Sequence, residues 1–246
     1  VPTAAAMLLN YPVNADVSSL RYACSGSSPF PTKLFEEFEE KLGVSILEGY
    51  GMTEATCLVT SNPPNGPRKV GSVGIPTPYS GARIFECDDD GNIEKNCGPN
   101  EIGEICIYGP GVVEGQTYTD DRRNKGLYAV ENGKTYLRTG DLGYLDEDDY
   151  LWITGRKKDL IIRGGHNIDP AEIEEALVHH PDVTFVGAIG EPDAVAGELP
   201  VAYVELAPGG TATEAEIMDF ARKHVPQKAA VPKRIIILPE LPKTAV

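Results

Sequence analysis

The chain has 246 residues, of which 41% are hydrophobic, and its formal net charge at pH 7 is -15. This composition is typical of an ordinary globular protein and excludes an intrinsically disordered chain. The negative charge argues against nucleic acid or an anionic membrane as the main partner, because both attract basic surfaces. A phosphate-bearing ligand would therefore need a local basic patch.

The first part of the chain predicts an α/β arrangement. Apolar residues recur with helical spacing over 34–42, glutamates occupy the opposite face, and Gly43 suits the C-terminal cap. A buried strand is expected over 44–47, followed by a turn at Gly49-Tyr50-Gly51. Ligands of α/β sheets bind beyond the C-terminal ends of the strands, and this interpretation places Tyr50 there.

From about residue 71 the pattern changes to short β-like runs separated by Pro, Gly, Asp and Asn, which favours a small barrel or sandwich. The runs 142–145 and 150–153 flank an acidic turn and predict a hairpin. This hairpin leads directly into the basic residues 156–158. We expect a domain boundary there, between residues 157 and 158.

The last part of the chain predicts a compact α+β domain of a size that can fold independently. Asp169 is expected to cap a helix that has Pro170 in its first position and Glu172 completing a capping box. The remaining expected elements are strands over 183–189, 201–206 and 234–238 and a capped helix over 213–224.

The cysteines are odd in number and lack Cys-x-x-Cys spacing, so neither a disulfide framework nor a zinc site is indicated. No apolar run approaches the roughly 20 residues that a bilayer span requires, and the N-terminal residues do not form a secretion signal. These features predict a cytoplasmic protein.

Two residues of the central region suit the ribose of a nucleotide. Asp141 follows Thr139 and Gly140, and Arg156 follows Thr154 and Gly155. An aspartate accepts hydrogen bonds from two vicinal hydroxyls, and an arginine supplies donors in a fixed fork. Arg156 also begins a basic segment that contains Lys157, Lys158 and Arg163, and the pair Gly164-Gly165 follows it.

Together with residues 48–54 (EGYGMTE), 71–76 (GSVGIP) and 103–111 (GEICIYGPG), these segments resemble the adenylate-forming superfamily of acyl-CoA synthetases, adenylation domains and luciferases. The resemblance covers nearly the whole chain. It implies the end of a large N-terminal domain over 1–157, with an α/β part over 1–70 and a distorted β-barrel part over 71–157. A small, mobile α+β C-terminal domain would follow over 158–246.

The resemblance also implies roles for individual residues. Thr53 would touch phosphate, Glu54 would hold Mg²⁺, and Arg156 would join them in catalysis. Adenine would lie between the Gly26-Ser27-Ser28 turn and the Tyr50 segment. The implied nucleotide-binding residues are Gly26, Ser27, Ser28, Glu48, Gly49, Tyr50, Gly51, Met52, Thr53, Asp141 and Arg156.

For the C-terminal domain the resemblance implies a hinge at Lys158 and a tunnel for the pantetheine arm of coenzyme A at Gly164, Gly165 and His166. Simpler interpretations stay open for several of these residues. Thr53-Glu54 suits a helix start, Asp141 an Asx turn and Gly164-Gly165 an ordinary turn. Lys158 suits a plain surface position, and His166 has no partner identifiable from sequence.

The implied function is ATP-dependent activation of a carboxylic acid as an acyl-adenylate, followed by transfer to the thiol of coenzyme A. A carrier-protein thiol as the acceptor is the alternative, and a non-catalytic nucleotide-binding module is a third interpretation. The family's phosphate loop and the lysine after a segment like Pro242–Val246 are absent from this sequence. We therefore expect a C-terminal piece of a longer enzyme, with little activity by itself.

Overall fold

The computed structural model describes residues 2–12, 14–28 and 30–242. Pro29, which follows the predicted Gly26-Ser27-Ser28 turn, and residues 243–246 of the last predicted segment lie outside the described residues. The chain divides into two compact units, Val1–Ile153 and Thr154–Val246. This division falls a few residues before the predicted boundary and places Arg156 in the second unit.

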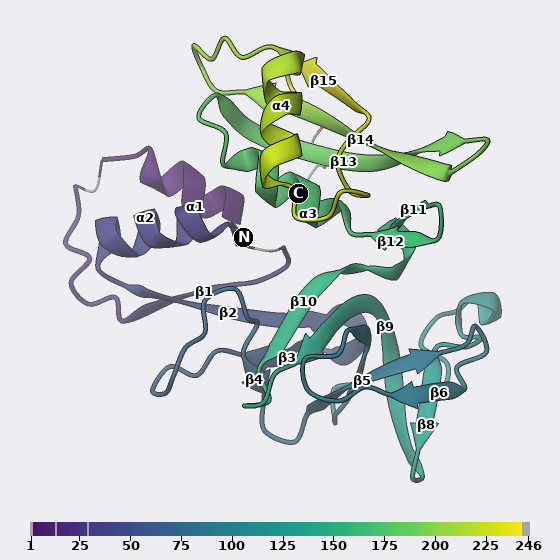
Figure 1. The fold of residues 1–246 in the computed structure, drawn as a ribbon. Coiled ribbons are helices and arrows are strands. Elements are labelled where there is room, and N and C mark those ends of the chain that lie inside the picture. The colour runs from purple at the N-terminus through teal and green to yellow at the C-terminus, as the bar shows by residue number, and fades with distance from the viewer. Residues whose placement is uncertain (1, 13, 29, 243–246) are drawn as a thin grey trace. The chain divides into compact units, whose positions relative to one another are not determined.

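The first sheet of the first unit has four strands in the order β1-β2-β3-β4, with β1 and β2 parallel (Figure 1). Helices α1 and α2 pack against each other beside it. The sheet continues to Pro76, past the predicted internal division at residue 70. Its elements are α1 (Pro2–Leu9), β1 (Tyr22–Ser25), α2 (Thr32–Leu42), β2 (Ser45–Met52), the 3-10 turn η1 (Thr53–Ala55), β3 (Cys57–Ser61) and β4 (Ile75–Pro76).

The second sheet of the first unit is strongly curved and has the order β10-β9-β7-β5-β6, with β8 also paired to β9. Antiparallel pairing joins β5 to β6 and to β7, and joins β9 to β7 and to β8, as in a barrel wall. The elements are β5 (Gly81–Cys87), β6 (Ile93–Asn96), β7 (Gly103–Tyr108), η2 (Asp121–Arg123), β8 (Tyr128–Glu131), β9 (Lys134–Leu145) and β10 (Leu151–Arg156). The last residues of β10, from Thr154 on, belong to the second unit.

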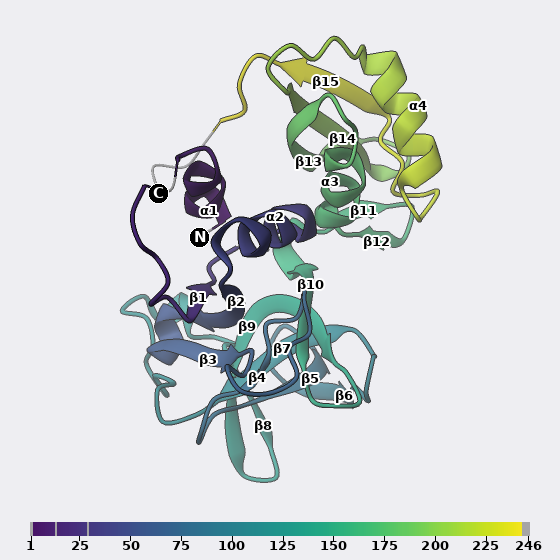
Figure 2. The same ribbon diagram turned by 90° about the vertical axis from the view of Figure 1, so that its left-hand side faces the viewer.

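The second unit is a sheet in the order β12-β11-β14-β13, with β15 parallel to β14. Helices α3 and α4 pack against this sheet (Figure 2). The elements are η3 (Lys157–Asp159), β11 (Ile161–Arg163), β12 (His166–Ile168), α3 (Pro170–Val178), β13 (Val183–Asp193), β14 (Gly197–Leu206), α4 (Glu214–His224) and β15 (Arg234–Leu238).

Helix α2 forms where the apolar periodicity predicts it. Phe35 and Phe38 are buried in one core with Ile46 of β2. Gly43 ends the helix in the left-handed conformation, with φ of 66°, and its N–H donates to the Glu39 carbonyl. A residue without a Cβ adopts this conformation at little cost, so the glycine sets the end of the helix.

The two helices of the second unit begin with side-chain caps. The Thr213 hydroxyl and the Glu216 carboxylate form a reciprocal capping box on α4. Asp169 caps α3 by accepting from Ala171 N–H, as predicted. The predicted role of Glu172 is wrong, because its carboxylate instead accepts two hydrogen bonds from Gln227. Within the described residues, no helix is both long enough and apolar enough to cross a bilayer.

The acidic turn between β9 and β10 is held by Asp146. Its Oδ2 accepts from Lys69 Nζ at 2.6 Å and from the Trp152 indole at 3.0 Å. Its Oδ1 accepts from the backbone N–H groups of Asp148 and Tyr150. Burial alone would raise the pKa of Asp146, but the hydrogen bonds from Lys69 and Trp152 outweigh it and lower the pKa to about 2.

We expect the stabilisation from Asp146 to be present above its ordinary pKa of 3.8 and to disappear as pH falls through the folded value of about 2. In Asp146→Asn, the loss of stability between about pH 4 and pH 2 should be smaller than in the wild type. Melting temperatures measured across this range test the prediction. Asp149→Asn, in the same turn but exposed, is the control, and equal acid sensitivity of the wild type and Asp146→Asn would contradict it.

Candidate nucleotide-binding site

The structure brings Tyr50 and Asp141 into direct contact. The Tyr50 hydroxyl on β2 donates to Asp141 Oδ2 on β9 at 2.5 Å. The two strands belong to different sheets of the first unit, and Asp141 is only 5% exposed. Two of the residues predicted to bind a nucleotide, far apart in the sequence, therefore form one polar site.

The local structure around Tyr50 differs from the prediction. Gly49, Tyr50 and Gly51 are not a turn but the end of β2, where the register against β3 shifts between Tyr50 and Gly51. A Cβ on Gly51 would lie 1.5 Å from the Cys57 carbonyl oxygen. The glycine therefore permits the close approach of β3 at this β-bulge, and the bulge is a device that re-aims neighbouring side chains.

The two segments predicted to flank adenine lie side by side. Strand β1 pairs in parallel with β2 up to Ser25 and Glu48, so the Gly26 turn follows beside Gly49. A Cβ on Gly26 would lie 2.8 Å from the Gly49 carbonyl oxygen. The following residues, Ser27 and Ser28, are exposed.

Asp141 lies within β9, at an irregularity of the strand. Residues 139–141 form a bulge in β9 opposite β7, and Gly140 has φ of 73°. Asp141 N–H donates to the Thr139 hydroxyl, and that hydroxyl donates to the Ile105 carbonyl. The bulge turns the Asp141 side chain toward Tyr50.

A buried ion pair supports this bulge. Glu104 of β7 accepts from Arg138 Nη2 at 2.8 Å, and both side chains are less than 10% exposed. The other Glu104 oxygen accepts from the Gly140 N–H. Burial alone would lower the pKa of Arg138, but the hydrogen bond and charge of Glu104 raise it overall. Arg138 also donates to the Gly126 carbonyl, so the pair ties three segments together.

Thr53 and Glu54 follow β2 directly in the 3-10 turn η1. The simpler interpretation of Thr53 as a helix cap is wrong, because the N-cap position is Met52 and no side chain caps the turn. Thr53 is exposed, and Met52 packs against the barrel core. The turn ends in two non-glycine residues with positive φ, Thr56 at 55° and Cys57 at 85°.

The Glu54 carboxylate accepts a short hydrogen bond from the Tyr118 hydroxyl at Oε1. This contact raises the pKa of Tyr118, and partial burial of the phenol adds to the shift. One carboxylate together with substrate phosphates is a usual Mg²⁺ environment, and Glu54 fits such a role. The described residues hold no group of three His, Cys, Asp or Glu that could bind a metal by itself.

Glu48 faces the protein interior. It is 7% exposed and accepts from the Gly71 N–H at 3.3 Å. Burial raises the pKa of Glu48, although backbone hydrogen bonds from Gly71 and Phe30 oppose the shift. Glu48 thus holds the chain near Gly71 against β2. Its contact with a nucleotide stays a prediction.

Arg156 and Lys158 lie in the second unit. Arg156 ends β10 and is exposed, and Lys158 lies in the following turn, η3. A Cβ on Gly155 would lie 2.4 Å from an Asp169 carboxylate oxygen. The glycine therefore lets the chain before Arg156 rest against the N-cap of α3. The predicted hinge at Lys158 stays a prediction.

Gly164 and Gly165 form the two-residue tip of the hairpin between β11 and β12, where Arg163 pairs with His166. Both glycines have positive φ, 55° and 84°, which is the requirement of a type I′ turn. His166 is exposed. The simpler interpretation of this pair as a turn is correct for its backbone. Its contact with coenzyme A stays a prediction.

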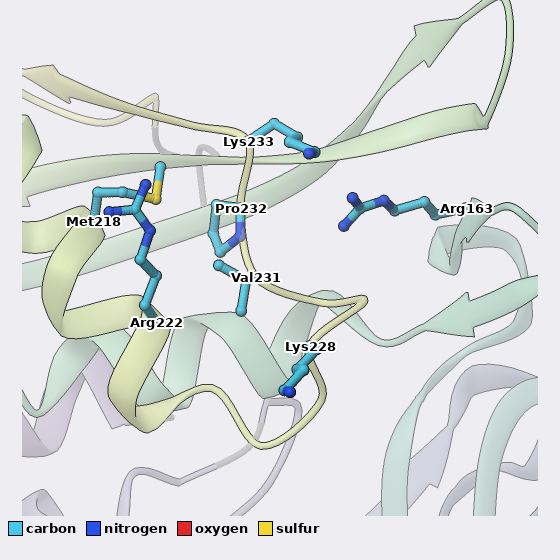
Figure 3. Close-up of a pocket in the computed structure, with 7 residues that line it drawn as sticks. All are labelled: Arg163, Met218, Arg222, Lys228, Val231, Pro232 and Lys233. Carbon is cyan, nitrogen blue, oxygen red and sulfur yellow. The ribbon is translucent and has the colours of Figure 1, made fainter.

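The second unit contains a basic cavity of about 220 Å³ (Figure 3). Arg163 reaches it from β11, and Lys233 reaches it from the segment before β15. Arg163 is fixed there by donating to the Ala229 carbonyl at 2.5 Å. The full lining is Arg163, Met218, Arg222, Lys228, Val231, Pro232 and Lys233.

Sequence reasoning missed most of this cavity. Arg163 belongs to the predicted basic segment, but Arg222, Lys228 and Lys233 come from other elements and carry no recognisable pattern. The fold of the second unit gathers them. Tyr118 was missed for the same reason, because no sequence spacing links it to Glu54.

The comparisons with known proteins agree with these observations. Residues 1–116 match the AMP-binding enzyme family, and residues 172–246 match the AMP-binding enzyme C-terminal domain. The chain belongs to the AMP-binding enzyme family. It is 47% identical over its full length to a marinolic acid–CoA ligase of Pseudoalteromonas, of which it covers 37%.

Two solved structures of this family resemble the fold. ATP-bound MatB from Rhodopseudomonas palustris matches with a TM-score of 0.88 at 33% identity. The match covers 99% of this chain and 47% of the MatB chain. The o-succinylbenzoate CoA synthetase of Bacillus subtilis in complex with an acyl-adenylate matches with a TM-score of 0.80 at 33% identity. This match covers 98% of this chain and 47% of the synthetase chain. The chain thus spans less than half of these relatives, and the predicted fold class is confirmed.

Removal of Glu104 is expected to destabilise the first unit. Glu104→Ala leaves Arg138 buried without its carboxylate, which costs about 3–5 kcal/mol. Glu86→Ala is the control, because it breaks only an exposed pair with Lys95, worth roughly 1 kcal/mol or less. Urea unfolding of both variants tests the difference, and equal losses would show that the buried pair has no special role.

Proposed function

We propose that the protein containing this chain is an AMP-forming ligase that activates a carboxylic acid with ATP and transfers the acyl group to coenzyme A. The observation that carries the proposal is the Tyr50–Asp141 hydrogen bond. It joins two segments that resemble separate motifs of the family in one partly buried polar site, which supports the proposal. The relatives that match the chain over its whole length include CoA ligases, which supports the choice of reaction.

In the first half-reaction a carboxylate oxygen attacks the α-phosphorus of ATP, and pyrophosphate leaves. Asp141 would accept from the ribose hydroxyls, with Tyr50 fixing the orientation of its carboxylate. Thr53 would donate to phosphate, and Arg156 would add donors to the ribose and the charged centre. Glu54 would hold Mg²⁺, which offsets the negative charge on the phosphates.

In the second half-reaction the thiol of coenzyme A attacks the acyl carbonyl carbon, and AMP leaves. The tip at Gly164 and Gly165 would border the path of the pantetheine arm, since neither glycine has a Cβ to obstruct it. We also propose that residues 158–246 turn about Lys158 between the two half-reactions. A few residues able to change their backbone angles suffice for such a hinge.

The basic cavity would bind phosphate groups of coenzyme A. Its volume of about 220 Å³ is smaller than that of pockets that enclose a whole drug-sized ligand, which hold roughly 300–1,000 Å³. It therefore suits a phosphoryl group better than a whole nucleotide. Arginine and lysine are the side chains that recognise phosphate, and here they are concentrated in a chain of net charge -15.

The decisive experiment is AMP release by the full-length protein over a panel of aliphatic, aromatic and amino acids, with ATP, Mg²⁺ and coenzyme A. We expect turnover on at least one class of acid that requires coenzyme A and stops with EDTA. Asp141→Asn should raise the Kd for AMP by about 10-fold or more, because a hydrogen bond to a charged group contributes roughly 1.5–3 kcal/mol. The exposed Asp149→Asn variant is the control.

Other outcomes would favour the other interpretations. Acid-dependent pyrophosphate release that coenzyme A does not accelerate would indicate a carrier-protein thiol as the acceptor. No turnover on any acid, with AMP still bound, would indicate a nucleotide-binding module and overturn the proposal.

The role of the cavity is tested separately. Lys233→Ala should raise the KM for coenzyme A by about 10-fold through the loss of one charge-assisted contact, while the KM for ATP stays unchanged. Lys223→Ala removes a lysine of α4 that does not line the cavity and should leave both constants unchanged. If the KM for ATP rises instead, the cavity serves the first half-reaction, in which ATP reacts with the acid.

A further inference from the structure

Tyr118 occupies a position that none of the family motifs identifies. It lies in the long irregular segment between β7 and β8, far from Glu54 in the sequence. Its hydroxyl nevertheless donates to Glu54 Oε1. Tyr118 thus contacts the carboxylate of Glu54, which lies directly after β2. This is the carboxylate that is proposed to bind a cation.

The segment that carries Tyr118 is fixed to the η1 turn at several further points. Val113 N–H donates to the Glu54 carbonyl at 2.9 Å, and the Thr56 hydroxyl donates to the Gly111 carbonyl at 2.6 Å. A Cβ on Gly111 would lie 2.6 Å from the Ala55 carbonyl oxygen. The turn and the segment therefore form one packed assembly, and the Tyr118 contact is not the chance approach of a loose loop.

Tyr118 is in turn held by Asn124. The Asn124 side chain accepts from Tyr118 N–H at 2.9 Å and donates to the Tyr118 carbonyl at 2.7 Å. A single amide thus fixes both backbone groups of the tyrosine. Both residues are half-buried. The support runs from Asn124 through Tyr118 to the Glu54 carboxylate.

We propose that Tyr118 is a positioning residue that holds Glu54 Oε1 so that Oε2 is presented to the cation bound with the ATP phosphates. This inference rests on the proposed function. A carboxylate with one oxygen engaged by a fixed donor has fewer rotamers to lose when it binds a metal. Partners of this kind typically change metal affinity by about 10–100-fold when they are removed.

The test compares Tyr118→Phe with wild type in the full-length protein. The Mg²⁺ concentration that gives half-maximal pyrophosphate release should rise by about 10-fold or more, with the KM for the acid unchanged. Mn²⁺ binding in the presence of a non-hydrolysable ATP analogue, followed by electron paramagnetic resonance, should weaken by the same factor. This second readout does not depend on turnover.

Tyr128→Phe is the matched control. The Tyr128 hydroxyl donates to the Val113 carbonyl in the same segment and does not contact Glu54. The Tyr128→Phe substitution therefore loosens the segment without freeing the Glu54 carboxylate. The Mg²⁺ response of this variant should stay that of the wild type. Asn124→Ala, which keeps the phenol but removes its support, should give an intermediate rise.

The outcomes separate the inference from the proposed function. An active wild type whose Mg²⁺ and Mn²⁺ responses are unchanged by Tyr118→Phe would overturn the inference and leave the function standing. Equal changes of the Mg²⁺ and Mn²⁺ responses in the Tyr118 and Tyr128 variants would show that Tyr118 only stabilises the segment, and would also overturn the inference. Absence of acid-dependent pyrophosphate release in the wild type would instead overturn the proposed function.

Discussion

The buried ion pair between Glu104 and Arg138 is the interaction on which the candidate site depends most. A charge pair inside a protein is favourable only when its remaining hydrogen-bonding groups are also satisfied. Here the second oxygen of Glu104 accepts from Gly140, inside the β9 bulge, and Arg138 reaches the Gly126 carbonyl. The charges thus support an irregular piece of backbone that a regular antiparallel ladder would not contain.

That irregularity directs Asp141 toward Tyr50. In a regular strand successive side chains alternate between the two faces of the sheet, and a bulge changes this alternation locally. A second bulge, where β2 meets β3, lies beside Tyr50. The 2.5 Å contact between the two sheets therefore arises where both sheets depart from regular geometry. Departures from regular strand pairing at two adjoining positions are typical of functional sites.

The regular elements were the most predictable part of the molecule. Helices α2 and α4 and strand β15 follow from apolar periodicity, caps and Gly43, and these signals act over only a few residues. The Gly49–Gly51 segment was wrongly predicted as a turn, because glycine in a sequence indicates a turn and a close approach of strands equally well. Only the tertiary contact with Cys57 distinguishes them. The family fold was predictable because its motifs recur in order along the chain, and the solved structures confirm it.

The site was predictable as a set of residues but not as a network. Asp141, Tyr50 and Glu54 lie within recognisable motifs, whereas Tyr118 and most of the cavity lining were found only in the structure. Their partners are distant in sequence, and no local spacing encodes such pairs. The roles of the motif residues, the hinge and the coenzyme A contact stay predictions.

The two positive-φ residues that end the η1 turn have a consequence for motion. Such a conformation at a non-glycine residue costs on the order of 1–3 kcal/mol and persists only when its surroundings enforce it. Thr56 and Cys57 are both exposed, so the enforcement comes from hydrogen bonds to the 111–118 segment and from pairing with β2. The turn therefore keeps this conformation only while those contacts hold, and their loss would release the backbone beside the Glu54 carboxylate.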